Sequence, residues 1–297
     1  ACACLDAAIR FHERRLRLRH GAPAGFEGAP HGSGFCAIAM GKLGARELNF
    51  SSDVDLVYVY GPDGQTAGVD GERSITHFAY YAKLAEHVTE AINRPTEDGY
   101  VFRVDLNLRP DGQNGPIVNS VRAAGLYYET FGRSWERNAL VKARAAAGDV
   151  AVGEELLRGL EPFVFRASLD LEVVQEIHAM KARIDARAGA EGREDLKLGR
   201  GGIREIEFFV SALQLLHGGR REGRALRERS VIPALDRLLF AGIVPVRDRD
   251  RLADAWLFLR RAEHLGVGIV HLGAGRAGHV AAGLVVAEAA RVEHREV

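Results

Sequence analysis

Alternating apolar and polar positions mark two segments of the chain as strands. Residues 49–60 lead into a β-branched and aromatic run whose even-numbered apolar side chains share one side, so Asp53 and Asp55 project to the other. In residues 101–110 the alternation is strict, and the polar side carries Asp105 together with Arg103, Asn107 and Arg109. If the two strands are sheet neighbours, Asp105 joins Asp53 and Asp55 in a three-carboxylate cluster beside guanidinium groups.

Other segments show different patterns. Phe35 to Met40 is a short apolar run typical of a buried strand, and residues 20–34 are rich in Gly and Pro, which predicts a loop or linker. Apolar residues recur every three or four positions in Leu5 to Arg19 and Thr76 to Asn93, which predicts helices. After Pro116 the same helical spacing predicts helices over 123–131, 135–145, 150–160, 171–188, 202–217, 222–240 and 248–265.

This order of elements predicts an α+β protein with segregated parts. We divide it into an N-terminal helix and linker over 1–34, a small mixed catalytic domain over 35–148 and a helical domain over 149–297. The tail from about residue 266 loses the helical pattern that precedes it, so we make no structural prediction for it.

Composition narrows the class of protein. Forty basic residues balance forty acidic ones among 297, so bulk charge suggests no nucleic-acid partner. Cys2, Cys4 and Cys36 have no pairing or zinc-ligand spacing, which favours a reducing cytoplasm. No apolar run is long enough to cross a bilayer, so we expect no membrane partner.

The acidic cluster predicts a metal site. Three neighbouring carboxylates repel one another unless cations neutralise them, and Mg²⁺ prefers a few carboxylate oxygens completed by substrate phosphate oxygens. Mn²⁺ is an alternative ion. The ordinary explanation, acidic residues in solvent at the start of a strand, would leave the concentration of charge on the second strand unexplained.

Several residues near the cluster are candidates for binding phosphate. Gly41, in a Gly-Lys-Leu-Gly turn with Lys42, lets backbone N–H groups approach an anion, and Ser52 carries a hydroxyl beside the acidic pair. Lys142 and Arg144 lie on a predicted helix and supply positive charge. Ordinary turns and a solvated basic helix face are the alternative explanations.

The motifs further along the chain leave two interpretations open. A Gly-rich turn precedes a helix at residues 202–217, where Glu205 and Glu207 either favour the helix dipole or orient a metal-bound water. No nucleophile elbow, Walker loop or zinc-protease motif occurs, so a mechanism based on carboxylates and metal remains.

Five motifs resemble, in order, the glutamine synthetase adenylyltransferase and adenylyl-removing family, over about residues 5 to 264. They lie at residues 40–56, 98–110, 135–144, 162–166 and 197–208. The resemblance implies a DNA polymerase β-like nucleotidyltransferase sheet. The sequences of the motifs are most similar to those of the amino-terminal, adenylyl-removing half of the family. By resemblance, Asp53, Asp55 and Asp105 are the metal-binding carboxylates and Gly41 is the superfamily glycine.

The implied reaction is phosphorolysis, in which phosphate attacks AMP attached to a tyrosine of glutamine synthetase and yields ADP. Implied partners are glutamine synthetase, the PII signalling protein, inorganic phosphate and adenine nucleotide. We expect phosphate to contact basic residues near the cluster, namely Arg103, Arg109, Lys142 and Arg144. Asn107 departs from the family, which often has Arg there. Two alternatives remain: a forward adenylyltransferase that uses ATP, and a non-catalytic docking or regulatory module.

Overall fold

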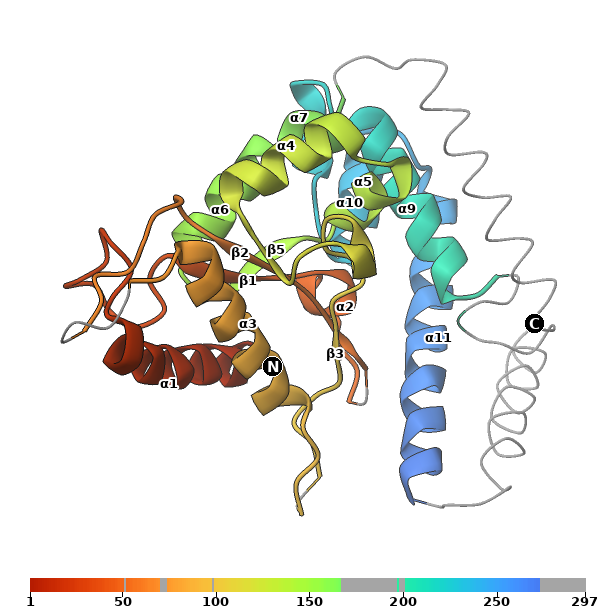
Figure 1. The fold of residues 1–297 in the computed structure, drawn as a ribbon. Helices are drawn as coiled ribbons and strands as arrows, with labels where there is room; N and C mark the ends of the chain where they lie inside the picture. The colour runs from red at the N-terminus through yellow and green to blue at the C-terminus, as the bar shows by residue number, and fades with distance from the viewer. Residues whose placement is uncertain (51, 70–73, 98, 167–196, 198–200, 273–297) are drawn as a thin grey trace. The chain divides into compact units, whose positions relative to one another are not determined.

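The computed structural model describes residues 1–50, 52–69, 74–97, 99–166, 197 and 201–272, with side chains as far as residue 265. Its backbone forms two compact units. The first comprises residues 1–48 and 52–166, and the second comprises residues 49–51 and 167–297 (Figure 1).

A small mixed sheet forms the centre of the first unit. Its strands run in the order β3-β2-β1-β5, and β4 also pairs with β2. β1 is antiparallel to β2 and β5, whereas β2 is parallel to β3 and β4. The strands are β1 (Phe35–Ala39), β2 (Val54–Tyr60), β3 (Val104–Asp105), β4 (Val118–Ser120) and β5 (Arg144–Gly148). The structure therefore confirms the α+β class and the strands predicted at residues 35–40 and within 49–60, whereas only Val104 and Asp105 of the strand predicted over 101–110 are in the sheet.

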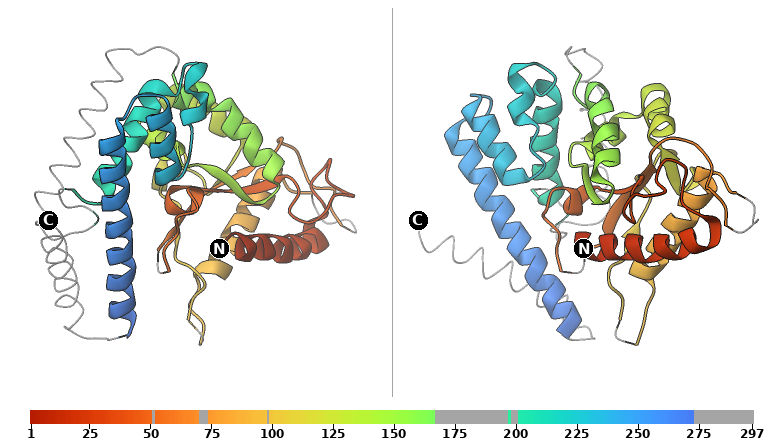
Figure 2. Two further views of the ribbon diagram at one scale, coloured as in Figure 1. Left: turned by 180° about the vertical axis from the view of Figure 1, so that it is seen from behind. Right: turned by 90° about the vertical axis from the view of Figure 1, so that its left-hand side faces the viewer.

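Helices cover both faces of this sheet (Figures 1 and 2). On one face, α1 (Cys2–His20) and α3 (His77–Asn93) pack against the even-numbered apolar residues of β2 and form the main hydrophobic core. On the other face, α4 (Val121–Phe131) and α6 (Val150–Gly159) lie over the sheet, and Gly153 of α6 approaches the Cys36 sulfur closely. These four helices confirm the helical spacing of the sequence.

The helix predicted over residues 135–145 is wrong in its second half. α5 (Ser134–Leu140) ends early, and Arg144–Gly148 instead forms β5, an edge strand paired with β1. The Arg-Ala-Ala-Ala segment has a strong intrinsic preference for helix. Pairing with β1 overrides that preference, because Ala145 and Ala147 become buried on the sheet.

The first unit also extends beyond the boundary that we placed at residue 148. Because α6 packs on β1 and β5, the compact unit continues through α7 (Glu161–Val164) to residue 166. Similarly, α1 belongs to this unit, since it packs on α3 and β5.

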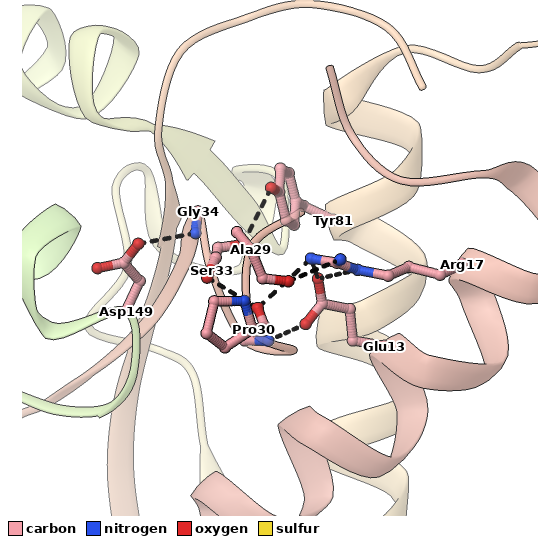
Figure 3. Close-up of polar contacts among 9 residues, drawn as sticks. Glu13, Arg17, Ala29, Pro30, Ser33, Gly34, Tyr81 and Asp149 are labelled. Carbon is pink, nitrogen blue, oxygen red and sulfur yellow. Dashed lines mark hydrogen bonds and ion pairs between the residues drawn. The ribbon is translucent and has the colours of Figure 1, made fainter. Parts of the chain in front are cut away.

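Residues 20–34 form a loop, as predicted, but this loop is bound tightly to the unit (Figure 3). Glu13 of α1, which is fully buried, accepts hydrogen bonds from Arg17 at 2.9 and 3.0 Å and from the Gly32 N–H. Arg17 in turn donates to the carbonyls of Ala29 and Pro30. The loop is therefore fixed on α1 by a buried ion pair instead of forming a free linker.

The second unit is helical where it is described. α9 (Ile203–His217), α10 (Val231–Phe240) and α11 (Val246–Leu272) pack around a core that includes Leu235 and Trp256. The helix predicted over 222–240 is divided into η2 (Glu222–Leu226) and α10, and the Gln214 side chain binds two carbonyls of the connecting segment. The helix predicted over 171–188 lies outside the described residues. No helix within the described ranges combines the length and apolarity needed to cross a membrane.

Candidate active site

The two strands that carry the acidic residues are neighbours in the sheet. β2 and β3 pair in parallel, with Asp55 opposite Asp105, and the Val54 N–H donates to the Arg103 carbonyl at 2.8 Å. Val54 is fully buried in the core, which directs Asp53 and Asp55 away from it. The predicted adjacency of these strands is therefore confirmed, although β3 is only two residues long.

The carboxylates nevertheless have separate partners. Asp53 forms an ion pair with Arg103, with 2.5 Å between Oδ1 and Nε. Asp105 Oδ1 accepts a hydrogen bond from the Asn107 N–H at 2.7 Å, a local turn that ends β3. Within the described residues, no three or more His, Cys, Asp or Glu side chains lie together in an arrangement that could hold a metal ion. The backbone thus brings Asp55 and Asp105 together, while metal binding by the trio stays a prediction.

Gly41 lies directly beside Asp55. It opens α2 (Gly41–Gly44), a single turn between β1 and β2, with φ at +48°. A Cβ atom at this position would lie 2.5 Å from Asp55 Oδ2, and the Met40 N–H donates to the Asp55 carbonyl at 2.9 Å. The backbone conformation and the close approach both require glycine at residue 41.

Arg144 secures the other end of this turn. Its guanidinium donates to the carbonyls of Leu43 at 3.1 Å and Gly44 at 3.3 Å. Gly44 itself has no room for a Cβ atom, which would collide with the Lys142 carbonyl. Because Arg144 holds the end of α2, it helps to place Gly41 beside Asp55. This function follows from its position on β5, which the helix prediction did not anticipate.

Arg109 organises the segment between β3 and β4. Its guanidinium donates to three backbone carbonyls, those of Leu106 at 2.9 Å, Gly115 at 3.2 Å and Gln113 at 3.3 Å. These bonds close residues 106–115 into a compact loop that contains η1 (Gly112–Asn114). The Pro-Asp-Gly sequence that follows Arg109 is a turn signal that could have indicated this role. Phosphate binding by Arg109 and Arg144 stays a prediction.

The remaining candidates lie on α2, just before β2 and just before β5. Lys142 Nζ is 3.8 Å from Glu47 Oε2, and both side chains are largely buried. Lys42 on α2 and Ser52 just before β2 are half-buried. Anion binding by these three residues stays a prediction.

Two charged residues at 136 and 137 act within the fold. Glu136 is buried and accepts from the Tyr127 hydroxyl at 3.0 Å and from the Arg133 N–H at 2.8 Å. Arg137 is also buried, donates to the Phe163 carbonyl at 2.9 Å and lies over the Phe163 ring. Together they join α4, α5 and α7. The sequence alone did not reveal this structural function, because it depends on contacts between separate helices.

In the second unit, Glu205 lies in the first turn of α9 and bonds to Gly201, the residue before the N-cap residue Gly202. Its Oε2 accepts from the Gly201 N–H at 2.5 Å, and Gly201 has φ at +75°. Of the two interpretations of Glu205, stabilisation of the helix start has direct support from this bond.

Comparisons with known proteins agree with the geometry of the first unit. A family model described as "Glutamate-ammonia ligase adenylyltransferase" matches residues 1–159, and one described as "GlnD PII-uridylyltransferase" matches residues 177–280.

Curated relatives are named "Bifunctional glutamine synthetase adenylyltransferase/adenylyl-removing enzyme". The relative from Hahella chejuensis is 42% identical over 262 residues, and the one from Stenotrophomonas maltophilia strain K279a is 45% identical; both matches cover 88% of this chain and 27% of the relative. The relative from Pseudomonas aeruginosa is 41% identical over 266 residues, 89% of this chain and 26% of its own length.

The chain therefore spans about a quarter of the length of these relatives. The first family model covers more than half of the chain, and it includes every strand of the sheet and all three candidate carboxylates. From these matches, the chain belongs to the glutamate-ammonia ligase adenylyltransferase family, a family of nucleotidyltransferases.

Proposed function

We propose that this chain removes AMP from adenylylated glutamine synthetase by phosphorolysis. An oxygen of inorganic phosphate attacks the phosphorus of the tyrosyl-AMP group and forms a new P–O bond, which gives ADP. The bond between phosphorus and the tyrosine oxygen breaks, and that oxygen takes up a proton. The observation that carries the proposal is the in-register pairing of Asp55 with Asp105, beside a glycine that leaves room at Asp55.

The donor atoms at this edge suit a hard divalent cation. Asp55 and Asp105 present carboxylate oxygens from adjacent positions of two strands, and Gly41 leaves the space beside Asp55 that a Cβ atom would fill. Asp53 would complete the set by leaving Arg103. When bound there, Mg²⁺ or Mn²⁺ would polarise the phosphoryl oxygens and stabilise the entering and leaving oxygens.

Arg103 is the strongest candidate for binding the attacking phosphate. Its ion pair with Asp53 is about half exposed on both sides, 58% for the Arg103 side chain and 50% for that of Asp53. Exposed pairs of this kind contribute only about 0–1 kcal/mol. The guanidinium can therefore exchange Asp53 for phosphate oxygens at little cost, and its planar fork matches them. Lys42, Ser52 and Lys142 are further candidates, whereas Arg109 and Arg144 act here as positioning residues.

Two further parts of the proposal rest on the family. We assign the sheet to the DNA polymerase β-like nucleotidyltransferase fold, in keeping with its mixed strands and helices on both faces. We also propose that the PII signalling protein is a partner, which the match of residues 177–280 to a PII-uridylyltransferase model supports. A cytoplasmic location stays a prediction from the cysteine pattern.

The experiment offers the chain two substrates. One mixture contains glutamine synthetase carrying radiolabelled AMP, inorganic phosphate and Mg²⁺; the other contains unmodified glutamine synthetase, labelled ATP and Mg²⁺. We expect labelled ADP from the first mixture and no incorporation in the second. Asp105→Asn should abolish ADP release, whereas Glu129→Gln, an exposed carboxylate on α4, should not change it. Incorporation of AMP without ADP release would establish the forward reaction instead.

A further inference from the structure

A segment that we call the finger projects beyond the end of α3 (Figures 1 and 2). It consists of residues 94–97 and 99–103. Near the tip, Thr96 and Gly99 exchange two backbone hydrogen bonds of 2.7 and 3.0 Å, and the Thr96 hydroxyl donates to the Gly99 carbonyl. At the base, the Phe102 N–H donates to the Ile92 carbonyl at 3.1 Å. The finger is therefore held in a defined shape at both ends.

The finger leaves two apolar side chains about half exposed. Tyr100 is 47% exposed and Val101 is 49% exposed. The next residue, Phe102, packs against the hydrophobic core of the first unit. Tyrosine is enriched among the residues that dominate protein–protein binding, and a preformed segment loses little freedom when it binds.

The finger leads directly into the candidate active site. Arg103 at its base pairs with Asp53, and Asp105 follows two residues later on β3. Asp105 lies five positions after Tyr100, and five fully extended residues span at most about 17 Å. A standard protein–protein interface covers about 800 Å² on each partner, equivalent to a disc of roughly 16 Å radius. A protein whose modified residue reaches Asp105 would therefore extend over the finger as well.

We propose that the finger is a docking element for the protein substrate, glutamine synthetase, which contacts Tyr100 and Val101 while its adenylylated tyrosine lies at the carboxylates. This inference rests on the proposed function for the identity of the partner. A small adenylyl ester, by contrast, would occupy the carboxylate edge without reaching Tyr100. The finger would then contribute to recognition of the protein and not to the chemical step.

The test compares binding and catalysis in the full chain. Binding of immobilised adenylylated glutamine synthetase is measured for the wild type and three variants: the double variant Tyr100→Ser/Val101→Ser, the conservative Tyr100→Phe, and Leu18→Ser. Leu18 is a matched control, since it is an apolar residue 74% exposed on α1. Phosphorolysis is measured with the protein and with the AMP ester of a tyrosine amide.

We expect the double variant to bind at least about 10-fold more weakly, with an increased KM for the protein substrate and an unchanged kcat. Its kcat/KM for the small ester should remain within about twofold of the wild type, which also reports an intact fold. Tyr100→Phe should retain most of the affinity, because it keeps the ring, and Leu18→Ser should bind like the wild type. Unchanged binding by the double variant, or no binding by the wild type, would overturn the docking role. Binding without ADP release would instead contradict the proposed function alone.

Discussion

Two ion pairs of the first unit share their chemistry and differ in their surroundings. Glu13 and Arg17 on α1 expose 0% and 12% of their side chains, and each also bonds to the backbone of residues 29–32. Asp53 and Arg103 expose 50% and 58%, and they connect the entrance of β2 to the residue before β3. The first pair is enclosed by the fold, and the second is half-exposed.

This difference assigns the two pairs opposite functions. Removing one partner of a buried pair leaves an uncompensated charge in the interior, which costs about 3–5 kcal/mol. An exposed pair contributes about 0–1 kcal/mol and separates readily. We therefore expect Glu13 and Arg17 to hold the fold together, whereas Asp53 and Arg103 remain available for substrate and metal.

The largest expected effect is on stability. Glu13→Ala should lower the free energy of unfolding by about 3–5 kcal/mol, because Arg17 keeps its burial and loses its carboxylate. Asp53→Ala should change it by less than about 1 kcal/mol. Urea unfolding followed by circular dichroism measures both. Equal losses in the two variants would remove the distinction between the pairs.

The rate of ADP release should depend on the carboxylates of the candidate site and not on carboxylates that act only in the fold. Asp55→Asn should lower the rate of ADP release by about 100-fold or more, equivalent to about 3 kcal/mol of transition-state stabilisation. Asp6→Asn serves as the control. The Asp6 carboxylate on α1 accepts from the Gly148 N–H on β5, and the variant should retain the wild-type rate per folded molecule. Full activity of Asp55→Asn would exclude this carboxylate from the reaction.

The buried pair should also make stability depend on pH. Burial raises the pKa of Glu13 from 4.5 to about 7, although Arg17 opposes the change. Between these values the folded state holds a proton that the unfolded state has released, so the free energy of unfolding falls as pH rises from about 5 to 8. The contribution is at most about 3 kcal/mol. Urea unfolding at both pH values should show a smaller decrease for Glu13→Gln, and an identical decrease in both proteins would contradict the shift.

The smallest effect compares two glycines. In Gly41→Ala, the alanine must adopt a positive φ, and its Cβ atom displaces Asp55 Oδ2. The substitution should therefore destabilise the protein by about 1–2 kcal/mol and reduce ADP release. Gly125→Ala, in α4 with nothing within 4 Å of the added Cβ atom, should stabilise it by about 0.5–1 kcal/mol. Thermal unfolding of both variants tests this contrast, and a loss of stability at Gly125 or a gain at Gly41 would contradict it.

The sequence predicted the exposed pair's surroundings better than those of the buried pair. Strict alternation in residues 101–110 predicted which side chains share a face with Asp105, because a period of two identifies the faces of a strand. The structure then confirms the expected pairing of Asp105 with Asp55. Glu13 and Arg17 were one turn apart on an amphipathic helix, and nothing local indicated that a Gly- and Pro-rich loop would fold over them. Their burial results from contacts between segments far apart in sequence.

The helix prediction for the segment around Arg144 failed for a related reason. Alanine and arginine favour helix locally, and the edge of β1 that recruits this segment lies more than a hundred residues earlier in the chain. Arg109 could have been recognised in part from the turn residues that follow it, but its three carbonyl partners depend on how the loop closes. Local patterns thus identified strands and candidate carboxylates, whereas the structural functions of the arginines required the fold.

Direct measurement of metal binding tests the central claim that Asp55 and Asp105 form one site. Mn²⁺ is titrated into the wild type and Asp105→Asn, and free Mn²⁺ is followed by electron paramagnetic resonance. The account predicts binding by the wild type that is weakened at least about 10-fold in the variant, since a carboxylate ligand is lost. The same affinity in both proteins, or no binding by the wild type, would contradict it.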